Sequence, residues 1–200
     1  MKDEKITRVR TERRDAAENR QRILDTASRL FDQYGVEHVS MNQIATEAEI
    51  GPGTLYRRYG NKGELCLDLI KDNLVLCFEN IEAYLEENQT APPSERLKGI
   101  LSIFIRFRES KAQLLKGVED ASLASRNKSR TRSPLYEELH QRFVGLFKEM
   151  DAGGEGQPNI IFRADMLLEA LKSDAYLFQR EIRGYSPKEI LDQLYLMFIS

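Results

Sequence analysis

The sequence predicts an all-α fold, and three observations carry this prediction. Apolar residues recur at helical spacing along nearly the whole chain, and residues that favour helix starts precede these apolar segments. No stretch shows the clear apolar–polar alternation of a half-buried strand. We expect about nine helices in total, arranged as an N-terminal three-helix domain followed by a larger helical domain.

The composition is that of a globular protein. Of the 200 residues, 41% are hydrophobic and 31% are charged, and the formal net charge is -2. No run approaches the roughly 18 apolar residues of a membrane-spanning helix, and the N-terminus lacks the apolar stretch of a signal peptide. We therefore expect a cytoplasmic location and no membrane partner.

The residues typical of catalytic and metal sites are sparse. Cys66 and Cys77 stand among apolar residues and are predicted to be small buried side chains, while His38 and His140 have no ligand cluster near them. The chain also lacks a phosphate-binding glycine loop, zinc-ligand spacing and a nucleophile elbow. We expect no catalytic residues, no metal and no cofactor, so an enzyme is the weakest hypothesis.

The N-terminal part of the chain predicts a basic arm and then two helices. The first fourteen residues hold six basic and three acidic side chains, so residues 1–16 are expected to form a flexible basic arm. This arm either touches phosphate or is only solvated, and charge alone leaves both open. Asp15 and Glu18 predict a capping box for a helix that stops at Gly35, and Ser40 with Gln43 predicts the next start.

The rest of the chain predicts six further helices and two breaks. A polar basic segment over residues 125–134 is expected to be a surface loop, with phosphate binding as the alternative, and residues 151–158 are an obvious break. The six helices are expected over residues 61–85, 94–107, 112–124, 134–147, 159–183 and 187–199.

The stretch GPGTLYRRYGNKGEL, residues 51–65, carries the most specific signal. On a helix, Thr54, Arg57 and Arg58 share one sector, while Leu55 and Tyr59 share another that can pack inward. The arginine fork matches guanine O6 and N7, and threonine can touch a thymine methyl group. The helical wheel alone does not separate a DNA-reading face from an ordinary solvated one.

The wider pattern around this stretch resembles a known family. An amphipathic helix ends in Phe-x-x-Tyr-Gly, and Ser-x-x-x-Ile-Ala-x-x-Ala, Gly-Thr-Leu-Tyr-x-x-Tyr and Lys-x-x-Leu follow in order. Residues 17–77 thereby resemble the DNA-binding domain of the TetR family of bacterial transcriptional regulators, with a helix-turn-helix at about residues 41–60. Residues 78–200 match the family only in length and helical character.

The resemblance implies DNA-binding roles for nine residues. Contacts to the sugar-phosphate backbone of DNA are expected from the start of the first short helix and from aromatic and basic residues around the second. Contacts to the bases are expected from the exposed face of the second helix. The implied DNA-binding residues are Ser40, Asn42, Gly53, Thr54, Tyr56, Arg57, Arg58, Tyr59 and Lys62.

The sequence departs from the family pattern at three positions. Glu49 stands where a turn glycine is usual, Gly60 replaces a common proline, and Gly63 replaces a common acidic residue. If Glu49 must adopt a positive φ, the cost is about 1 kcal/mol. These departures affect the expected local geometry and remove none of the implied DNA contacts.

The resemblance also implies a homodimeric, ligand-responsive repressor of a palindromic double-stranded DNA operator. The last two helices, at about residues 159–183 and 187–199, would pair the subunits, and a small-molecule effector would bind among the middle helices. The candidate pocket residues are Phe104, Phe107, Phe143, Phe147 and Met166, and ordinary core packing competes with ligand contact for each. A helix-turn-helix protein with an architectural or cell-division role and no effector remains the alternative.

Overall fold

The computed structural model describes residues 2–124, 134–150 and 159–198. The described residues form nine α-helices and one π-helical segment and include no strand, which confirms the all-α prediction. They divide into two compact units, Met1–Leu69 and Ile70–Ser200. The sequence placed this boundary after residue 77, eight residues further along the same helix. The predicted loops at residues 125–133 and 151–158 lie outside the described residues.

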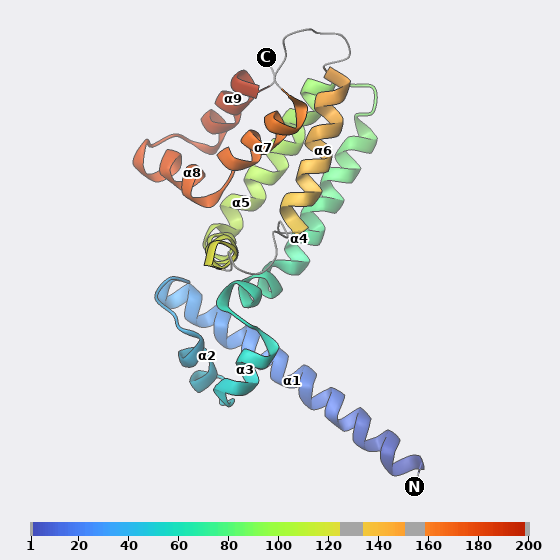
Figure 1. Cartoon of the computed structure of the whole chain (residues 1–200), viewed down its shortest axis with the longest axis vertical. Coiled ribbons are helices and arrows are strands. Elements are labelled where there is room, and N and C mark those ends of the chain that lie inside the picture. The colour runs from blue at the N-terminus through green and yellow to red at the C-terminus, as the bar shows by residue number, and fades with distance from the viewer. Residues whose placement is uncertain (1, 125–133, 151–158, 199–200) are drawn as a thin grey trace. The chain divides into compact units, whose positions relative to one another are not determined.

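The first unit contains α1 (Lys2–Tyr34), α2 (Met41–Glu47), α3 (Pro52–Arg58) and the start of α4 (Lys62–Glu87) (Figure 1). Contacts run from α1 to α2 and from α2 to α3. The apolar face of α1 is buried in this core, together with Ile44 of α2, Leu55 of α3 and Leu65 of α4. This face consists of Ile23, Leu24, Ala27, Leu30 and Phe31. Gly35 ends α1 with a φ of 82°, as the sequence predicted.

The predicted start of α1 at Asp15 is wrong, because the helix continues back to Lys2. Residues 2–16 contain neither glycine nor proline, so nothing in this segment interrupts helical hydrogen bonding once the helix has formed. The arm predicted over residues 1–16 therefore has a helical backbone from Lys2 onward.

The second unit contains the rest of α4 with α5 (Pro93–Ala124), α6 (Pro134–Met150), α7 (Ile160–Ala170), α8 (Ser173–Leu177), the π-helical segment η1 (Phe178–Ile182) and α9 (Pro187–Phe198). Figure 1 shows α5 and α6 side by side, with α7 packed on α6 and α9 on α5. Their shared core is apolar and includes Ile100, Phe104, Phe143 and Phe147. Lys111, whose φ and ψ of -133° and 23° are not helical, divides α5 between the two helices predicted separately.

The single helix predicted over residues 159–183 is wrong, because the chain breaks after Ala170 and restarts at Ser173. The side chain of Asn159 caps α7: its Oδ1 accepts from the amides of Ile161 and Phe162 at 2.9 and 3.2 Å. Lys172 then adopts an extended backbone, with a ψ of 154°. This break separates α7 from the continuous segment of α8 and η1, where apolar periodicity predicted one long helix.

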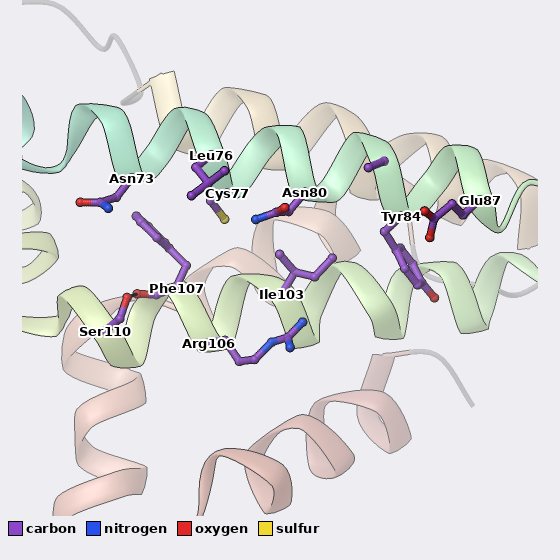
Figure 2. Close-up of a pocket in the computed structure, with 11 residues that line it drawn as sticks. Asn73, Leu76, Cys77, Asn80, Tyr84, Glu87, Ile103, Arg106, Phe107 and Ser110 are labelled. Atoms are coloured by element: carbon purple, nitrogen blue, oxygen red, sulfur yellow. Dashed lines mark hydrogen bonds between the residues drawn. The ribbon is translucent and has the colours of Figure 1, made fainter.

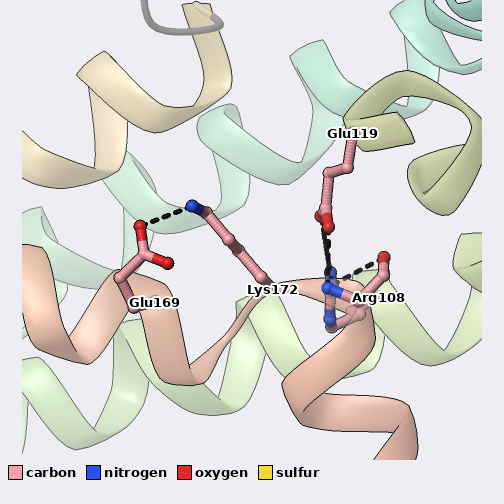
Figure 3. A network of polar contacts seen from close by, with 5 residues as sticks. Arg108, Glu119, Glu169 and Lys172 are labelled. Atoms are coloured by element: carbon pink, nitrogen blue, oxygen red, sulfur yellow. Dashed lines mark hydrogen bonds and ion pairs between the residues drawn. The ribbon is translucent and has the colours of Figure 1, made fainter. Parts of the chain in front are cut away.

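A buried polar cluster holds the chain at this break. The Ser173 amide donates to Glu119 Oε2 at 2.7 Å, and Arg108 Nη2 donates to Ser173 Oγ at 2.9 Å. Arg108 and Glu119 also pair at 3.2 Å, and Figure 3 shows their side chains facing each other. The carboxylate thus satisfies an amide at the start of α8 that a continuous helix would have bonded internally.

No helix within the described ranges is long and apolar enough to cross a membrane.

Candidate nucleic-acid interface

The helix α2 begins as the sequence predicted. Ser40 is its N-cap, with an extended backbone, and Ser40 Oγ accepts a hydrogen bond from the Gln43 amide at 3.1 Å. Met41, Ile44 and Ala45 face the core, whereas Ser40 and Asn42 are exposed. The two residues implied in DNA contact thus lie at one exposed end of α2.

The turn between α2 and α3 is a Schellman motif with a glutamate in the glycine position. Glu49 has a φ of 53°, its amide donates to the Thr46 carbonyl at 3.1 Å, and the Ile50 amide donates to the Ala45 carbonyl at 3.0 Å. The left-handed backbone expected for Glu49 is therefore present. The turn therefore holds a left-handed residue at the steric cost of a β-carbon.

The helix α3 buries one face and exposes another. Pro52 occupies its first turn after the N-cap Gly51, and the Leu55 side chain is completely buried. Gly53, Thr54, Tyr56 and both arginines are exposed. A β-carbon at Gly53 would meet no atom within 4 Å, so this part of α3 presents bare backbone to the outside.

The two arginines of α3 have different surroundings. Arg57 has no hydrogen-bond or ion-pair partner among the residues that the structure describes. Arg58 turns toward α1: its Nη1 donates to the Ala16 carbonyl oxygen at 3.4 Å, and its guanidinium carbon lies 5.9 Å from the centre of the Tyr59 ring. The exposed sector predicted from the helical wheel therefore contains one unengaged guanidinium and one that already has contacts.

Tyr59 and Lys62, implied as phosphate ligands, have internal partners in the structure. Tyr59 is only 5% exposed, and its hydroxyl donates to Asp68 Oδ2 at 2.5 Å. Lys62 Nζ donates to the carbonyl oxygens of Val36 and Val39 at 2.5 and 3.0 Å, in the connection between α1 and α2. Both side chains stabilise the first unit where the resemblance implied phosphate contact.

Asn61 and Glu64 cap the start of α4, where the sequence predicted a helix to begin. Asn61 Oδ1 accepts from the Glu64 amide at 3.0 Å, and Glu64 Oε2 accepts from the Gly60 amide at 2.9 Å. A β-carbon at Gly60 would lie 3.1 Å from Glu64 Oε1, so the glycine leaves room for this carboxylate. The proline that is common at this position has no amide hydrogen to donate.

The sequence analysis missed Asp68 and Arg20. Asp68 accepts from the Tyr59 hydroxyl, and it also pairs with Arg20, whose Nη2 lies 2.6 Å from Asp68 Oδ1. This pairing holds the pKa of Asp68 below its usual value, whereas burial and the nearby Asp68 raise the pKa of Tyr59. Arg20 and Asp68 are 48 positions apart, so no local pattern in the sequence connects them.

A groove lies between α4 and α5 within the second unit (Figure 2). Its volume is about 610 Å³, and its apolar lining includes Leu76, Cys77, Ile103 and Phe107. Polar groups also line it: Asn73, Asn80, Tyr84, Glu87, Arg106 and Ser110. Apolar and hydrogen-bonding side chains therefore line the groove together.

Only one of the five candidate pocket residues lines this groove. Phe107 does, whereas Phe104, Phe143 and Phe147 are buried in the core, and Met166 of α7 is exposed. The sequence correctly identified these phenylalanines as inward-facing but gave no way to distinguish packing against protein from packing against a cavity.

The last helices expose a set of large apolar side chains. These are Ile161, Phe162 and Met166 on α7, Phe178 and Ile182 on η1, Tyr185 in the following turn, and Leu196 and Met197 on α9. Phe162 and Met197 are 59% and 75% exposed. Exposed apolar residues in such number are typical of an interaction surface.

An exposed polar helix that follows a Schellman turn and packs on the short helix before it has the arrangement of a helix-turn-helix. The family model described as "Bacterial regulatory proteins, tetR family" matches residues 23–69. An HTH-type transcriptional regulator of Staphylococcus aureus (strain USA300) is 37% identical over 178 residues, covering 87% of this chain and 89% of the relative. The chain belongs to the TetR family of bacterial transcriptional regulators.

Solved structures agree with this assignment at the level of the fold. Thermus thermophilus FadR, a TetR-family transcriptional repressor solved in complex with lauroyl-CoA, aligns with a TM-score of 0.66 and 20% identity, covering 90% of this chain and 93% of that one. A TetR-family regulator from Syntrophomonas wolfei aligns with a TM-score of 0.60 and 15% identity, covering 92% and 94%. At these identities, the likeness supports the fold alone.

Proposed function

We propose that this protein is a homodimeric repressor that binds a palindromic operator through α3 and is released by a small-molecule effector. The observation that carries the proposal is the exposed face of α3. Gly53, Thr54 and Arg57 are exposed on this face, while the completely buried Leu55 anchors the helix in the core. A helix held in this way can enter the major groove with its polar face toward the bases.

Within this proposal, Arg57 and Thr54 read bases and Gly53 permits close approach. The unengaged guanidinium of Arg57 is available for a bidentate contact to guanine. Arg58 is less available for a base contact because its guanidinium already donates to the Ala16 carbonyl oxygen of α1. Ser40, Asn42 and Tyr56 contact phosphates, and Tyr59 and Lys62 act by holding the fold around α3. The basic arm, residues 1–16, supplies further charge near the DNA backbone.

The exposed apolar residues of α7 and α9 support pairing of two subunits. Burying Phe162 and Met197 against a second copy removes apolar surface from water, and two reading helices then meet successive major grooves about 34–36 Å apart. A dimer explains why one short reading helix is sufficient in each subunit.

The groove between α4 and α5 is the proposed effector site. Its apolar side chains, such as Ile103 and Phe107, and the exposed Arg106 suit an amphipathic anion. Because the similarly folded FadR of Thermus thermophilus binds lauroyl-CoA, long-chain acyl-CoA thioesters are the first effectors to test.

The proposal is tested by selecting bound duplexes from a random DNA pool at a stated, near-physiological salt concentration. We expect an inverted repeat, and we expect Arg57→Ala to relax preference at one base pair in each half-site. Lys71→Ala, at an exposed position on α4, is the matched control and leaves the preference unchanged. Recovery of no motif, with binding that disappears as salt rises, would leave only non-specific DNA binding.

A further inference from the structure

Asp68 joins three elements of the first unit through one carboxylate. Its Oδ1 accepts from Arg20 Nη2 at 2.6 Å, and its Oδ2 accepts from Arg20 Nε at 3.0 Å and from the Tyr59 hydroxyl at 2.5 Å. Arg20 lies on α1, Asp68 on α4, and Tyr59 directly after α3. The paired, planar contact with Arg20 fixes the orientation of the carboxylate as well as its distance.

Tyr59 is the residue through which this carboxylate reaches α3. It is the C-cap of that helix: its amide donates to the Leu55 carbonyl at 2.8 Å, while its own backbone is already extended, with φ and ψ of -126° and 107°. The position of the Tyr59 side chain therefore determines where α3 ends and in which direction its last turn points. Arg57 lies in that last turn.

We propose that Asp68 is a positioning residue for base reading: by holding Tyr59 against Arg20, it sets the orientation in which α3 presents Arg57 to DNA. This inference rests on the function proposed for α3. Asp68 does not itself touch the DNA in this arrangement, and it acts through Tyr59.

The fold does not depend on the polar contact alone. Tyr59 is only 5% exposed, and Leu55 and Leu65 of the same unit are completely buried, so we expect the ring to stay in the apolar core without its hydroxyl bond. The Arg20–Asp68 pair is partly exposed, with 37% and 19% of the two side chains accessible, and such pairs contribute little to stability. Loss of the carboxylate is thus expected to loosen the orientation of α3 more than to unfold the unit.

Specific and non-specific DNA binding respond differently to this loosening. A bidentate arginine–guanine contact requires a fixed direction, so a small rotation of α3 weakens it. Contacts to phosphates tolerate the rotation and carry no sequence information. The ratio of specific to non-specific affinity is therefore the quantity that separates positioning from a general loss of folded protein.

The test measures affinities of the full chain for the operator selected by the wild type and for a scrambled duplex, across several salt concentrations. Asp68→Ala, which removes the acceptor, and Tyr59→Phe, which removes the donor, are each expected to lower operator affinity about tenfold, leaving scrambled-DNA affinity and the salt slope unchanged. The double variant is expected to lose no more than either single one, because both changes break the same contact. Arg29→Gln, which breaks the exposed Arg29–Glu47 pair between α1 and α2, is the matched control and is expected to match the wild type.

Each result has a definite meaning. Equal losses on both duplexes, or unchanged operator affinity in Tyr59→Phe, would overturn the positioning role of Asp68 while leaving the proposed function standing. A wild-type chain that does not distinguish operator from scrambled DNA would overturn the proposed function and this inference with it. Tyr59→Phe keeps the buried ring, so the test remains available even if Asp68→Ala lowers the melting temperature.

Discussion

Lys62 Nζ lies 2.5 Å from the carbonyl oxygen of Val36 and serves as a cationic clamp on the connection between α1 and α2. The same ammonium donates to the Val39 carbonyl at 3.0 Å and is 3.4 Å from that of Glu37. These carbonyls lie just after the end of α1, where a cation also interacts favourably with the helix dipole. A lysine at the start of α4 therefore holds the segment that leads into the helix-turn-helix.

We predict that Lys62→Met lowers the free energy of unfolding by about 2 kcal/mol, because hydrogen bonds from a charged donor are lost and partly buried carbonyls remain unpaired. Urea unfolding followed by circular dichroism measures the change. Lys71→Met, at an exposed position on the same helix, is the control and should stay within about 0.5 kcal/mol of the wild type. Unchanged stability with a reduced salt slope of DNA binding would instead favour direct phosphate contact by Lys62.

The left-handed backbone of Glu49 predicts that a glycine there stabilises the turn. At a φ of 53°, the β-carbon is sterically unfavourable, and Glu49→Gly should raise the free energy of unfolding by about 0.5–1 kcal/mol, after the greater entropy of the unfolded glycine chain is subtracted. Thermal and urea unfolding provide the measurement. Glu49→Ala removes the same charge but keeps the β-carbon, so it should show no gain. Equal stability of the glycine and alanine variants would contradict the strain at this position.

Local patterns in the sequence predicted the helix-turn-helix and its caps. Ser40 caps α2 as expected, Asn61 and Glu64 cap the start of α4, and Ser186 and Glu189 form a reciprocal capping box at the start of α9. These contacts join residues three or four positions apart, so residue types and spacing are sufficient to identify them. The core faces followed from helical periodicity in the same way.

Contacts between distant parts of the chain could not be predicted. The inward direction of Lys62 depends on carbonyl groups about 25 positions earlier, and no residue type marks a carbonyl as a partner. The break before Ser173 depends on Glu119, 54 positions away, and so apolar periodicity alone predicted an uninterrupted helix. Residue roles carried over from the family matched the exposed surface of α3 and did not anticipate the internal partners of Tyr59.

The contact of Tyr84 with Gly99 predicts that α4 and α5 tolerate no side chain at this crossing. A β-carbon on Gly99 would lie 2.0 Å from Tyr84 Cζ, and the tyrosine hydroxyl already donates to the Glu95 carbonyl oxygen at 3.1 Å. Gly99→Ala should therefore lower the free energy of unfolding by about 1–3 kcal/mol, despite the better helix propensity of alanine. Urea unfolding measures this loss. Gly145→Ala on α6, where a β-carbon meets no atom within 4 Å, is the control and should be neutral or stabilising. If Gly99→Ala lowers the free energy of unfolding less in a Tyr84→Ala background than in the wild type, the Tyr84 ring is the obstacle.

The buried pair of Arg108 and Glu119 predicts a strongly asymmetric double-mutant cycle. Arg108 is 2% exposed and its Nε has no partner among the described residues, so burial lowers the pKa of this guanidinium, while burial raises the pKa of Glu119. Glu119→Gln leaves a buried cation without its anion and should cost about 3–5 kcal/mol. Arg108→Met fills much of the same space, and the Glu119 carboxylate that it leaves is 28% exposed and still accepts from the Ser173 amide. It should therefore cost less, about 1–3 kcal/mol.

The double variant decides whether the pair is a source of stability or a means of holding the start of α8. Glutamine at position 119 can still accept from the Ser173 amide, and the Arg108→Met/Glu119→Gln variant has no charge at either position. We expect this chain to be about as stable as Arg108→Met alone, far from the sum of the two single losses. Lys188→Gln, which breaks the exposed Lys188–Asp192 pair on α9, serves as the control and should change the free energy of unfolding by less than about 0.5 kcal/mol. Additive losses in the double variant would show that Arg108 and Glu119 stabilise the second unit independently.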